Sequence, residues 1–307
     1  MKVLKDYTLV FAMVLGLALF LSFRYVPLFS EYKEGADAIT SAIMPSFIFV
    51  MLFLSFTTVS PKDLKPKKWF LWHLLFQLGV SSALLFILLP FDVKIASALY
   101  VSFICPTAVA STVITDKLRG NVASLVSYII VVNCVVSFAI PLILPMIPGE
   151  EKIPFLPMVW TIMKKIFPLL VLPVLSAWCL RWLWPWLHNF FYKIRWVSFY
   201  IWALSLVLLI ADILDSLFAD GYISIVEVLI MLCSCMACLL QFFLGKRFAA
   251  SDGPDSISAR QALGQKNTIF AIWLCVTFLD PVVAVAPGSY ILWQNIVNSI
   301  ELRRSRK

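Results

Sequence analysis

The sequence lacks any long hydrophilic stretch and has few charged residues. Aspartate, glutamate, lysine and arginine make up 14% of its 307 residues, against about 25% in typical soluble domains. Hydrophobic residues make up 62%, in runs that recur from end to end. Each run is near the roughly 20 residues that cross a bilayer as a helix. These features exclude a soluble globular protein and predict a single all-α polytopic membrane domain over residues 1–307.

Histidine is also scarce, and catalytic motifs are absent. The chain has only His73 and His188, each near the edge of an apolar run. It contains no zinc-protease, nucleophile-elbow or phosphate-loop motif, and no acidic pair lies deep in an apolar run. A membrane-embedded enzyme would need a convergent acid, base or nucleophile set. We therefore expect a protein that is not an enzyme and needs no cofactor.

The seven cysteines all fall inside apolar runs, which argues against a disulfide framework. The cluster CSCMAC, residues 233–238, fits either a soft metal site or polarizable packing residues on a membrane helix. A metal-binding spacing normally comes with a second ligand pair, which this chain lacks. Packing is therefore the favoured interpretation, and we expect no bound metal.

Ten membrane spans are predicted from the apolar runs. They cover approximately residues 7–23, 39–59, 69–90, 94–117, 121–147, 166–184, 196–217, 222–244, 256–279 and 281–300. The first is expected to be a retained helix, because no small-x-small cleavage site follows it. Residues 154–165 are interpreted as an interfacial lead-in to the sixth span. Pro168 and Pro173 predict a kink in that span.

The distribution of basic residues predicts the orientation. With ten spans both termini lie on one side of the membrane, and that side receives eighteen of the 25 lysines and arginines. Cytoplasmic loops carry such an excess, so both termini are expected in the cytoplasm and the protein in the cell inner (plasma) membrane. The net charge of +8 is explained by this topology and by contact with anionic lipid heads, without nucleic acid.

Two spans are interrupted at matching places. Pro106 and Thr107 lie in the middle of the fourth span, and Gly264 to Asn267 lie in the middle of the ninth. Taken singly, a proline kink or a packing glycine explains either feature. Their matched positions predict two inverted five-helix repeats, residues 1–150 and 151–307. Paired broken helices in inverted halves mark the binding site of many transporters.

Lys266 is the least expected residue of the ninth span. A lysine at the centre of a membrane helix costs about 2.5–3.5 kcal/mol even on the lenient insertion scale. A further apolar run separates it from Asp280, so its ammonium is too deep to reach the interface. Asp212 and Asp215, near the end of the seventh span, are weaker candidates. They fit a cation pair or proton relay, but a solvated helix end is the favoured interpretation.

Several motifs resemble those of the bile acid:sodium symporter superfamily. CPTAVASTVITDKLRGNVASLVS resembles the signature of its first crossing helix, ALGQKNTIFA that of its second, and FLDPVVAVAPGSYILWQNIVNSI its last helix. MPSFIFVMLFLSFTTVSPKDLK resembles the second helix and the following loop. The positions that match the signatures are Cys105, Pro106, Ser111, Leu118, Gly120, Asn121, Gly264 and Asn267. The resemblance spans most of the chain in order and spacing.

The resemblance implies ten helices divided into a panel and a core, with two broken helices that cross in the core. It also implies transport of an organic anion, often together with two sodium ions. Substrate is then expected beside the crossing. The candidate substrate-binding residues are Thr107, Ser111, Thr112, Lys266, Asn267 and Thr268.

The departures from the family pattern concern its sodium ligands. The matching positions are Ser111, Thr112, Ile129, Ala262 and Lys266. Ser111 and Thr112 keep an oxygen, but Ile129 has none, and Ala262 replaces the carboxylate shared by the two sites. Lys266 puts a positive charge where the family has a glutamine, as in a divergent, bacterial-type member. Because sodium needs several hard oxygens, we predict that both sodium sites are degenerate.

Lys266 is therefore interpreted as a tethered internal cation that holds together the partly negative ends of the broken helices. We expect a secondary active transporter of a small organic anion that works by alternating access. If Lys266 releases its proton during the cycle, transport is proton-coupled; if it stays charged, the protein is a uniporter or an exchanger. The alternatives are a sodium-coupled symporter of the bile acid type and a transport-inactive membrane sensor or scaffold.

Overall fold

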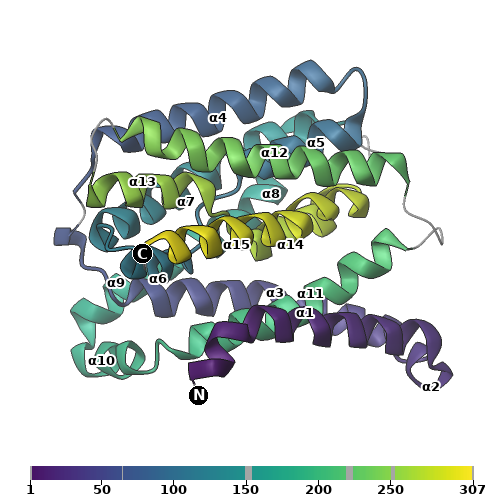
Figure 1. Cartoon of the computed structure of the whole chain (residues 1–307), viewed down its shortest axis with the longest axis horizontal. Helices are drawn as coiled ribbons and strands as arrows, with labels where there is room; N and C mark the ends of the chain where they lie inside the picture. The colour runs from purple at the N-terminus through teal and green to yellow at the C-terminus, as the bar shows by residue number, and fades with distance from the viewer. Residues whose placement is uncertain (1, 64, 149–153, 219–223, 250–252, 306–307) are drawn as a thin grey trace.

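The computed structural model describes residues 2–63, 65–148, 154–218, 224–249 and 253–305. Within these residues every regular element is a helix, and the helices form two layers (Figure 1). The predicted boundary between repeats, at residues 150 and 151, lies outside the described residues. So do Arg306 and Lys307 of the basic tail.

The lower layer in Figure 1 packs around three long helices. α1 lies along α11, α11 along α3, and α3 along α9. α2 follows α1 at one end of the layer, and α10 follows α9 at the other (Figure 1). The bounds are Lys2–Tyr25 for α1, Pro27–Ser30 for α2, Lys33–Phe56 for α3, Leu172–Leu183 for α9, Pro185–Lys193 for α10 and Val197–Leu217 for α11.

The upper layer is built from the two interrupted spans and the helices around them (Figure 1). α12 packs on α13, α15 and α5, and α4 packs on α5. η1, Pro61–Asp63, lies on the segment that links α3 to α4. The bounds of the first group of the upper layer are Lys68–Leu88 for α4, Val93–Ile104 for α5, Ser111–Lys117 for α6, Val122–Ile143 for α7 and Leu144–Met146 for η2. Those of its second group are Ile225–Phe248 for α12, Pro254–Gly264 for α13, Thr268–Phe278 for α14, Pro281–Ala284 for η3 and Val285–Ser305 for α15.

α8, Phe155–Leu170, connects the layers because it packs on α7, α9 and α3. It continues into α9 through a bend of 42° beside Val171, which confirms the predicted kink. Proline explains the bend, since Pro168 and Pro173 flank Val171 and cannot donate backbone hydrogen bonds. The helix already begins at Phe155, so the expected interfacial lead-in forms the first part of α8.

Several helices begin at a polar residue whose side chain caps the N-terminus of the helix. Asn121 starts α7, and its side-chain oxygen accepts a hydrogen bond from the Ser124 N–H at 3.1 Å. Ser224 starts α12 through a reciprocal capping box with Glu227. Such caps satisfy N–H groups that have no partner within the helix, which stabilises each start by about 1 kcal/mol.

Among the described residues, four single helices are long and apolar enough to cross a membrane: α3, α4, α7 extended by η2, and α12. The count becomes six if α8 with α9, and α10 with most of α11, each form one bent span. These findings support a multi-pass membrane protein. The full set of ten spans stays a prediction, because the interrupted spans are split into shorter helices.

The packing pairs correspond between the two halves of the chain. α5 packs against α15 of the second half, and α13 packs against α7 of the first. Likewise α1 packs on α11, while α9 packs on α3. In each half one predicted span is divided into two helices separated by a few residues. These are α5 and α6 in the first half, and α13 and α14 in the second.

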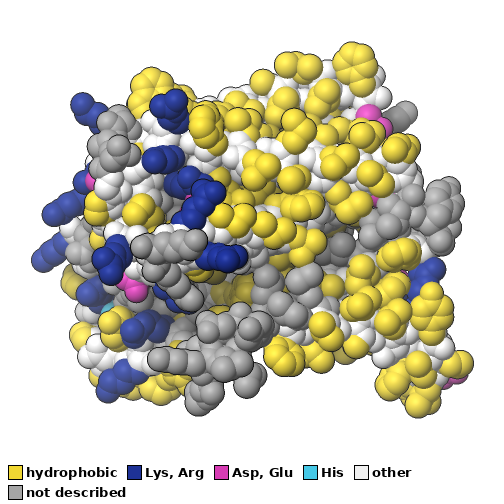
Figure 2. All heavy atoms as spheres, in the orientation of Figure 1, with side chains coloured by type: hydrophobic (Ala, Val, Ile, Leu, Met, Phe, Trp, Pro, Cys, Tyr) yellow, Lys and Arg dark blue, Asp and Glu magenta, His cyan; other side chains and the backbone are white. Residues whose placement is uncertain are grey.

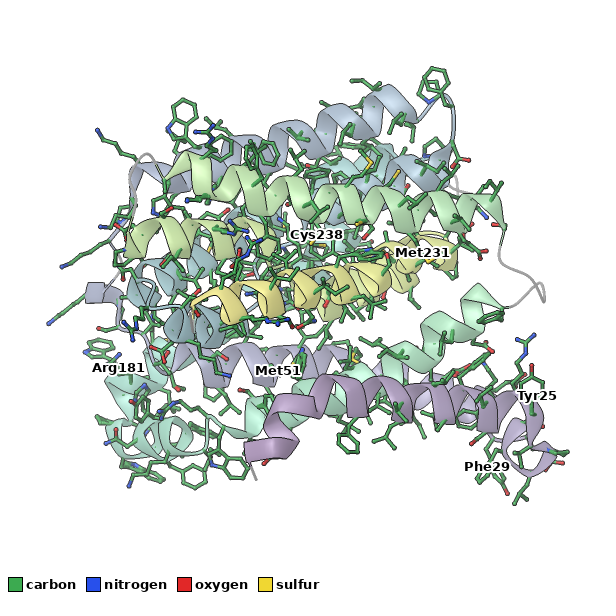
Figure 3. The ribbon with its side chains drawn as sticks, viewed as in Figure 1. Tyr25, Phe29, Met51, Arg181, Met231 and Cys238 are labelled. Carbon is green, nitrogen blue, oxygen red and sulfur yellow. The ribbon has the colours of Figure 1, made fainter. Side chains whose placement is uncertain are left out.

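Charged side chains gather at one end of the molecule. Figure 2 shows lysine and arginine side chains around the end where the chain terminates, while hydrophobic side chains cover the middle of the face. Arg181 lies at this basic end, and Tyr25 and Phe29 lie at the opposite end (Figure 3). An apolar band between polar ends is the surface expected of a protein that sits in a bilayer.

Candidate functional site

The two interrupted helices meet at their breaks. Thr107 and Lys266 form an isolated antiparallel bridge. The Ala108 N–H donates to the Gln265 carbonyl at 3.0 Å, and the Asn267 N–H donates to the Pro106 carbonyl at 2.8 Å. A broken helix leaves backbone N–H and C=O groups without partners inside the helix. In this contact, backbone groups of one break form hydrogen bonds with backbone groups of the other.

The two bridge residues also cap each other's helix reciprocally. The Lys266 ammonium donates to the Phe103 carbonyl at 2.9 Å. The Thr107 hydroxyl donates to the Ala262 carbonyl at 2.5 Å. Each acceptor lies one helical turn before the residue across the bridge, so the pattern is symmetric about the Thr107–Lys266 pair. The interruptions predicted at matching places are thus brought together in space.

Lys266 lies in the interior, with its side chain only 2% exposed. α5 and α13 both end at the crossing, and the C-terminal end of a helix carries a partial negative charge of about half a unit. An ammonium at such an end is stabilised by the helix dipole and by the Phe103 carbonyl. The ammonium reaches the end of α5, and its role in holding together the ends of both broken helices stays a prediction.

Two glutamines complete the cap at the end of α5. The Gln77 side-chain N–H donates to the Ile104 carbonyl at 2.7 Å and to the Cys105 carbonyl at 3.0 Å. Gln241, from α12, donates to the Ser102 carbonyl at 3.1 Å. Both side chains are fully buried. Cys238, one turn before Gln241, lies near the middle of the molecule in Figure 3.

α15 supplies the supports at the end of α13. The Tyr290 hydroxyl donates to the Gly264 carbonyl at 2.9 Å and accepts from Gln241 at 3.1 Å. The Gln294 side-chain oxygen accepts the Lys266 backbone N–H at 3.0 Å. Phe242 lies directly against Gly264, where an added Cβ would stand 2.4 Å from the ring. Only glycine fits at this position.

The predicted substrate-binding residues all lie in or beside the two breaks. Thr107, Ser111, Lys266 and Thr268 are buried, whereas Thr112 and Asn267 are half-buried. Asn267 caps α14, since its side-chain oxygen accepts from the Phe270 N–H at 3.2 Å. The structure therefore gathers the set, and contact with a substrate stays a prediction for each member.

The residues matched to the sodium ligands offer few open oxygens. The Ser111 hydroxyl donates to the Ala108 carbonyl at 2.5 Å, and the Thr112 hydroxyl donates to the Val109 carbonyl at 2.8 Å. Ile129 and Ala262 are buried and have no side-chain oxygen. Among the described residues no group of three or more histidine, cysteine, aspartate or glutamate side chains is placed to hold a metal, and all seven cysteines are free.

The motif residues Gly120 and Asn121 have a structural role. The Asn121 side-chain amide donates to Asp255 at 2.9 Å and its backbone N–H donates to the Pro254 carbonyl at 3.1 Å, which fixes the start of α7 to the start of α13. A Cβ on Gly120 would stand 2.6 Å from the Thr115 side chain. This part of the motif joins helices at the basic end rather than lining the crossing.

Asp212 and Asp215 lie away from the crossing. They line a pocket of about 140 Å³ between α1, α3 and α11 in the lower layer. The Lys33 ammonium pairs with Asp215 at 2.9 Å and with Asp37 at 2.7 Å. The side chains of Lys33 and Asp215 are 31% and 38% exposed, so this ion pair is also compatible with the favoured interpretation, a solvated helix end.

Sequence reasoning missed Gln77, Gln241, Tyr290 and Gln294. Each is a polar residue inside an apolar helix, which is the available signal for an internal hydrogen bond. Its partner is a backbone carbonyl or N–H on another helix, however, and the sequence does not reveal such a pairing.

Comparison with known proteins adds the family. A family model described as the SBF-like CPA transporter family matches residues 9–295, nearly the whole chain. The chain belongs to this family. The family is of the bile acid:sodium symporter type, so the resemblance drawn from the motifs is confirmed at the level of the family. No curated protein matches the chain significantly.

Membership in the SBF-like CPA transporter family places the chain among membrane transporters, which agrees with its apolar helices. The family is not enzymatic. The replacement of a sodium-site glutamine by Lys266 is a finer statement than the match supports, and it stays a prediction.

Proposed function

We propose that this member of the SBF-like CPA transporter family is a secondary active transporter of a small organic anion that works by alternating access. Lys266 serves as its internal cation in place of the family's two sodium ions. The observation that carries the proposal is the ammonium of Lys266, buried at the crossing and donating to the Phe103 carbonyl at 2.9 Å. A bound metal ion would otherwise supply this positive charge.

The layered arrangement supports the architecture that the proposal needs. The lower layer corresponds to a panel and the upper layer to a core, and the two breaks cross inside the upper layer. The reciprocal packing pairs favour two inverted five-helix repeats and ten spans. The basic end visible in Figure 2 favours a plasma-membrane protein with both termini in the cytoplasm.

The chemistry at the breaks favours an anionic substrate. α6 and α14 begin at the crossing, and the N-terminal end of a helix carries partial positive charge. The buried ammonium adds a full charge nearby. Asn267 and Thr112 are the half-buried members of the predicted set, so they are the most accessible to an approaching substrate.

Transport into proteoliposomes tests the proposal. A thermal-shift screen of carboxylates and sulfonates first identifies a ligand, and uptake of the best hit is then measured with sodium and with choline. We expect equal uptake in both salts. We expect the Lys266→Met variant to fold, because methionine has a similar length. Its uptake rate should fall at least about tenfold, which corresponds to roughly 1.4 kcal/mol.

Two controls accompany this experiment. Lys266→Arg keeps the positive charge and is expected to retain more uptake than Lys266→Met. A pH-sensitive dye inside the vesicles reports whether protons move with the substrate, which separates proton coupling from uniport or exchange. Uptake that requires sodium, or full uptake by Lys266→Met, contradicts the proposal. A ligand that stabilises the protein but never accumulates favours a sensor.

A further inference from the structure

The C-terminal end of α5 has an unusual set of hydrogen-bond donors. The final carbonyls of an α-helix have no partner within the helix. In α5 the Val101 carbonyl still accepts from the Cys105 N–H, so the unpaired carbonyls begin one residue later. They belong to Ser102, Phe103, Ile104 and Cys105, and each accepts from a side chain of another element.

We infer that Gln77 and Gln241 are positioning residues that, together with Lys266, close the end of α5 to dissolved cations. The inference rests on the proposed function, because it explains how the place of a metal ion is filled. Lys266 supplies the charge and the glutamines occupy the neighbouring oxygens. Three side chains, rather than Lys266 alone, thus exclude cations from the end of α5.

The orientation of the Gln77 amide follows from a partner on its oxygen, and that of Gln241 from the acceptors of its nitrogen. The Tyr128 hydroxyl donates to the Gln77 side-chain oxygen at 3.3 Å, which turns the amide nitrogen toward the carbonyls of α5. The Gln241 nitrogen reaches the Tyr290 oxygen, and the Tyr290 hydrogen is used on the Gly264 carbonyl. Gln77 cannot present its own oxygen to a cation without breaking its bond to Tyr128, whereas the buried Gln241 oxygen has no partner among the described residues.

The chemical consequence is a site that has lost its ligands as well as its charge. Sodium and similar hard cations bind through several oxygen atoms that point lone pairs at the ion. Here those lone pairs face N–H groups, and the N–H groups carry partial positive charge. Replacing Lys266 by a neutral residue would free only the Phe103 carbonyl. A single oxygen is not enough to coordinate a cation.

A simpler explanation is that any buried amide in a membrane helix needs a partner. The two explanations differ in one measurable respect. A glutamine that is merely structural lowers stability equally in every salt when it is removed. A glutamine that closes a cation site leaves carbonyl oxygens behind, and sodium then restores part of the lost stability.

The test compares thermal unfolding of the purified full-length protein in sodium chloride and in choline chloride, each at about 0.15 M. The variants are Lys266→Gln alone and Lys266→Gln combined with Gln77→Leu or with Gln241→Leu. Lys266→Gln combined with Asn133→Leu is the matched control, because Asn133 is an equally buried amide whose side-chain atoms have no partner among the described residues.

We expect sodium to raise the melting temperature of the Gln77→Leu and Gln241→Leu double variants by about 3 °C or more. Wild type, Lys266→Gln and the Asn133 control should differ by less than about 1 °C between the salts. If a leucine variant does not fold, Tyr128→Phe with Lys266→Gln replaces it. That change only releases the Gln77 amide to turn its oxygen toward the carbonyls, and the same sodium response is expected.

The outcomes separate this inference from the proposed function. A full sodium response in Lys266→Gln alone, or none in any double variant, overturns the role of the glutamines and leaves the internal cation standing. A sodium response in the wild type removes the internal cation itself. A response in the Asn133 control shows that the effect is not specific to the end of α5, which also overturns the inference.

Discussion

The break after α5 and the break after α13 have the same backbone arrangement and different chemistry. In both, a bridge residue caps the partner helix one turn back. The end of α5 receives an ammonium and two amides, whereas the end of α13 receives the hydroxyls of Thr107 and Tyr290. The backbone arrangement is thus symmetric, but only the end of α5 receives a positive charge.

The comparison extends to the residue two positions before each bridge residue. Cys105 stands there in the first break and Gly264 in the second. Gly264 has no room for a side chain because the Phe242 ring fills the space, whereas Cys105 is simply buried. The second break therefore has no room for a side chain at this position, and it is also the break that carries the lysine.

The largest expected effect on stability comes from Gly264→Ala. The added methyl would meet the Phe242 ring, and such overpacking costs about 2–3 kcal/mol of the free energy of unfolding. The equivalent change in the first break, Cys105→Ala, removes only one buried sulfur and should cost about 1 kcal/mol. Chemical denaturation in detergent measures both. Equal losses at the two positions would contradict the difference in packing.

Thr107→Val is expected to have an intermediate effect. It preserves shape but leaves the Ala262 carbonyl without its donor, which should cost about 1–2 kcal/mol. Thr107→Ser keeps the hydroxyl and serves as the matched control, with a smaller loss in the same denaturation measurement. If valine and serine behave alike, the reciprocal cap contributes nothing at this side of the bridge.

The smallest effect is expected at Ser111. Its hydroxyl only reaches back to the Ala108 carbonyl of its own segment, so Ser111→Ala should change the free energy of unfolding by less than about 0.5 kcal/mol. The sodium response of the melting temperature should stay absent in this variant. A sodium-dependent change would show that Ser111 still acts as a cation ligand and would contradict the prediction that the sodium site is degenerate.

Much of the crossing could be predicted from the sequence, because its signals are local. Pro106 cannot continue the hydrogen-bonding pattern of a helix, and Gly264 begins a polar run in an otherwise apolar span. Both breaks appear where these residues lie. The burial of Lys266 was likewise predictable, since the apolar residues after it leave its ammonium no route to water.

The supports of the crossing could not be predicted in the same way. Gln77 and Gln241 lie far from α5 in sequence, and their acceptors are backbone carbonyls that look alike in every helix. Only the packing of α4 and α12 decides which carbonyls they reach. The helical form of residues 155–165, interpreted only as an interfacial lead-in, was not predicted either, although proline fits the first turn of a helix.

The antiparallel bridge between Thr107 and Lys266 also has a mechanical consequence. Four half-helices are fastened at one point by backbone bonds in both directions, so a displacement of any one of them carries the other three. We therefore expect the crossing to move as a single rigid body. We expect bending in the chain segments that link the layers, such as residues 57–63, where the Thr57 and Val59 carbonyls are hydrogen-bonded to the His188 and Trp178 side chains.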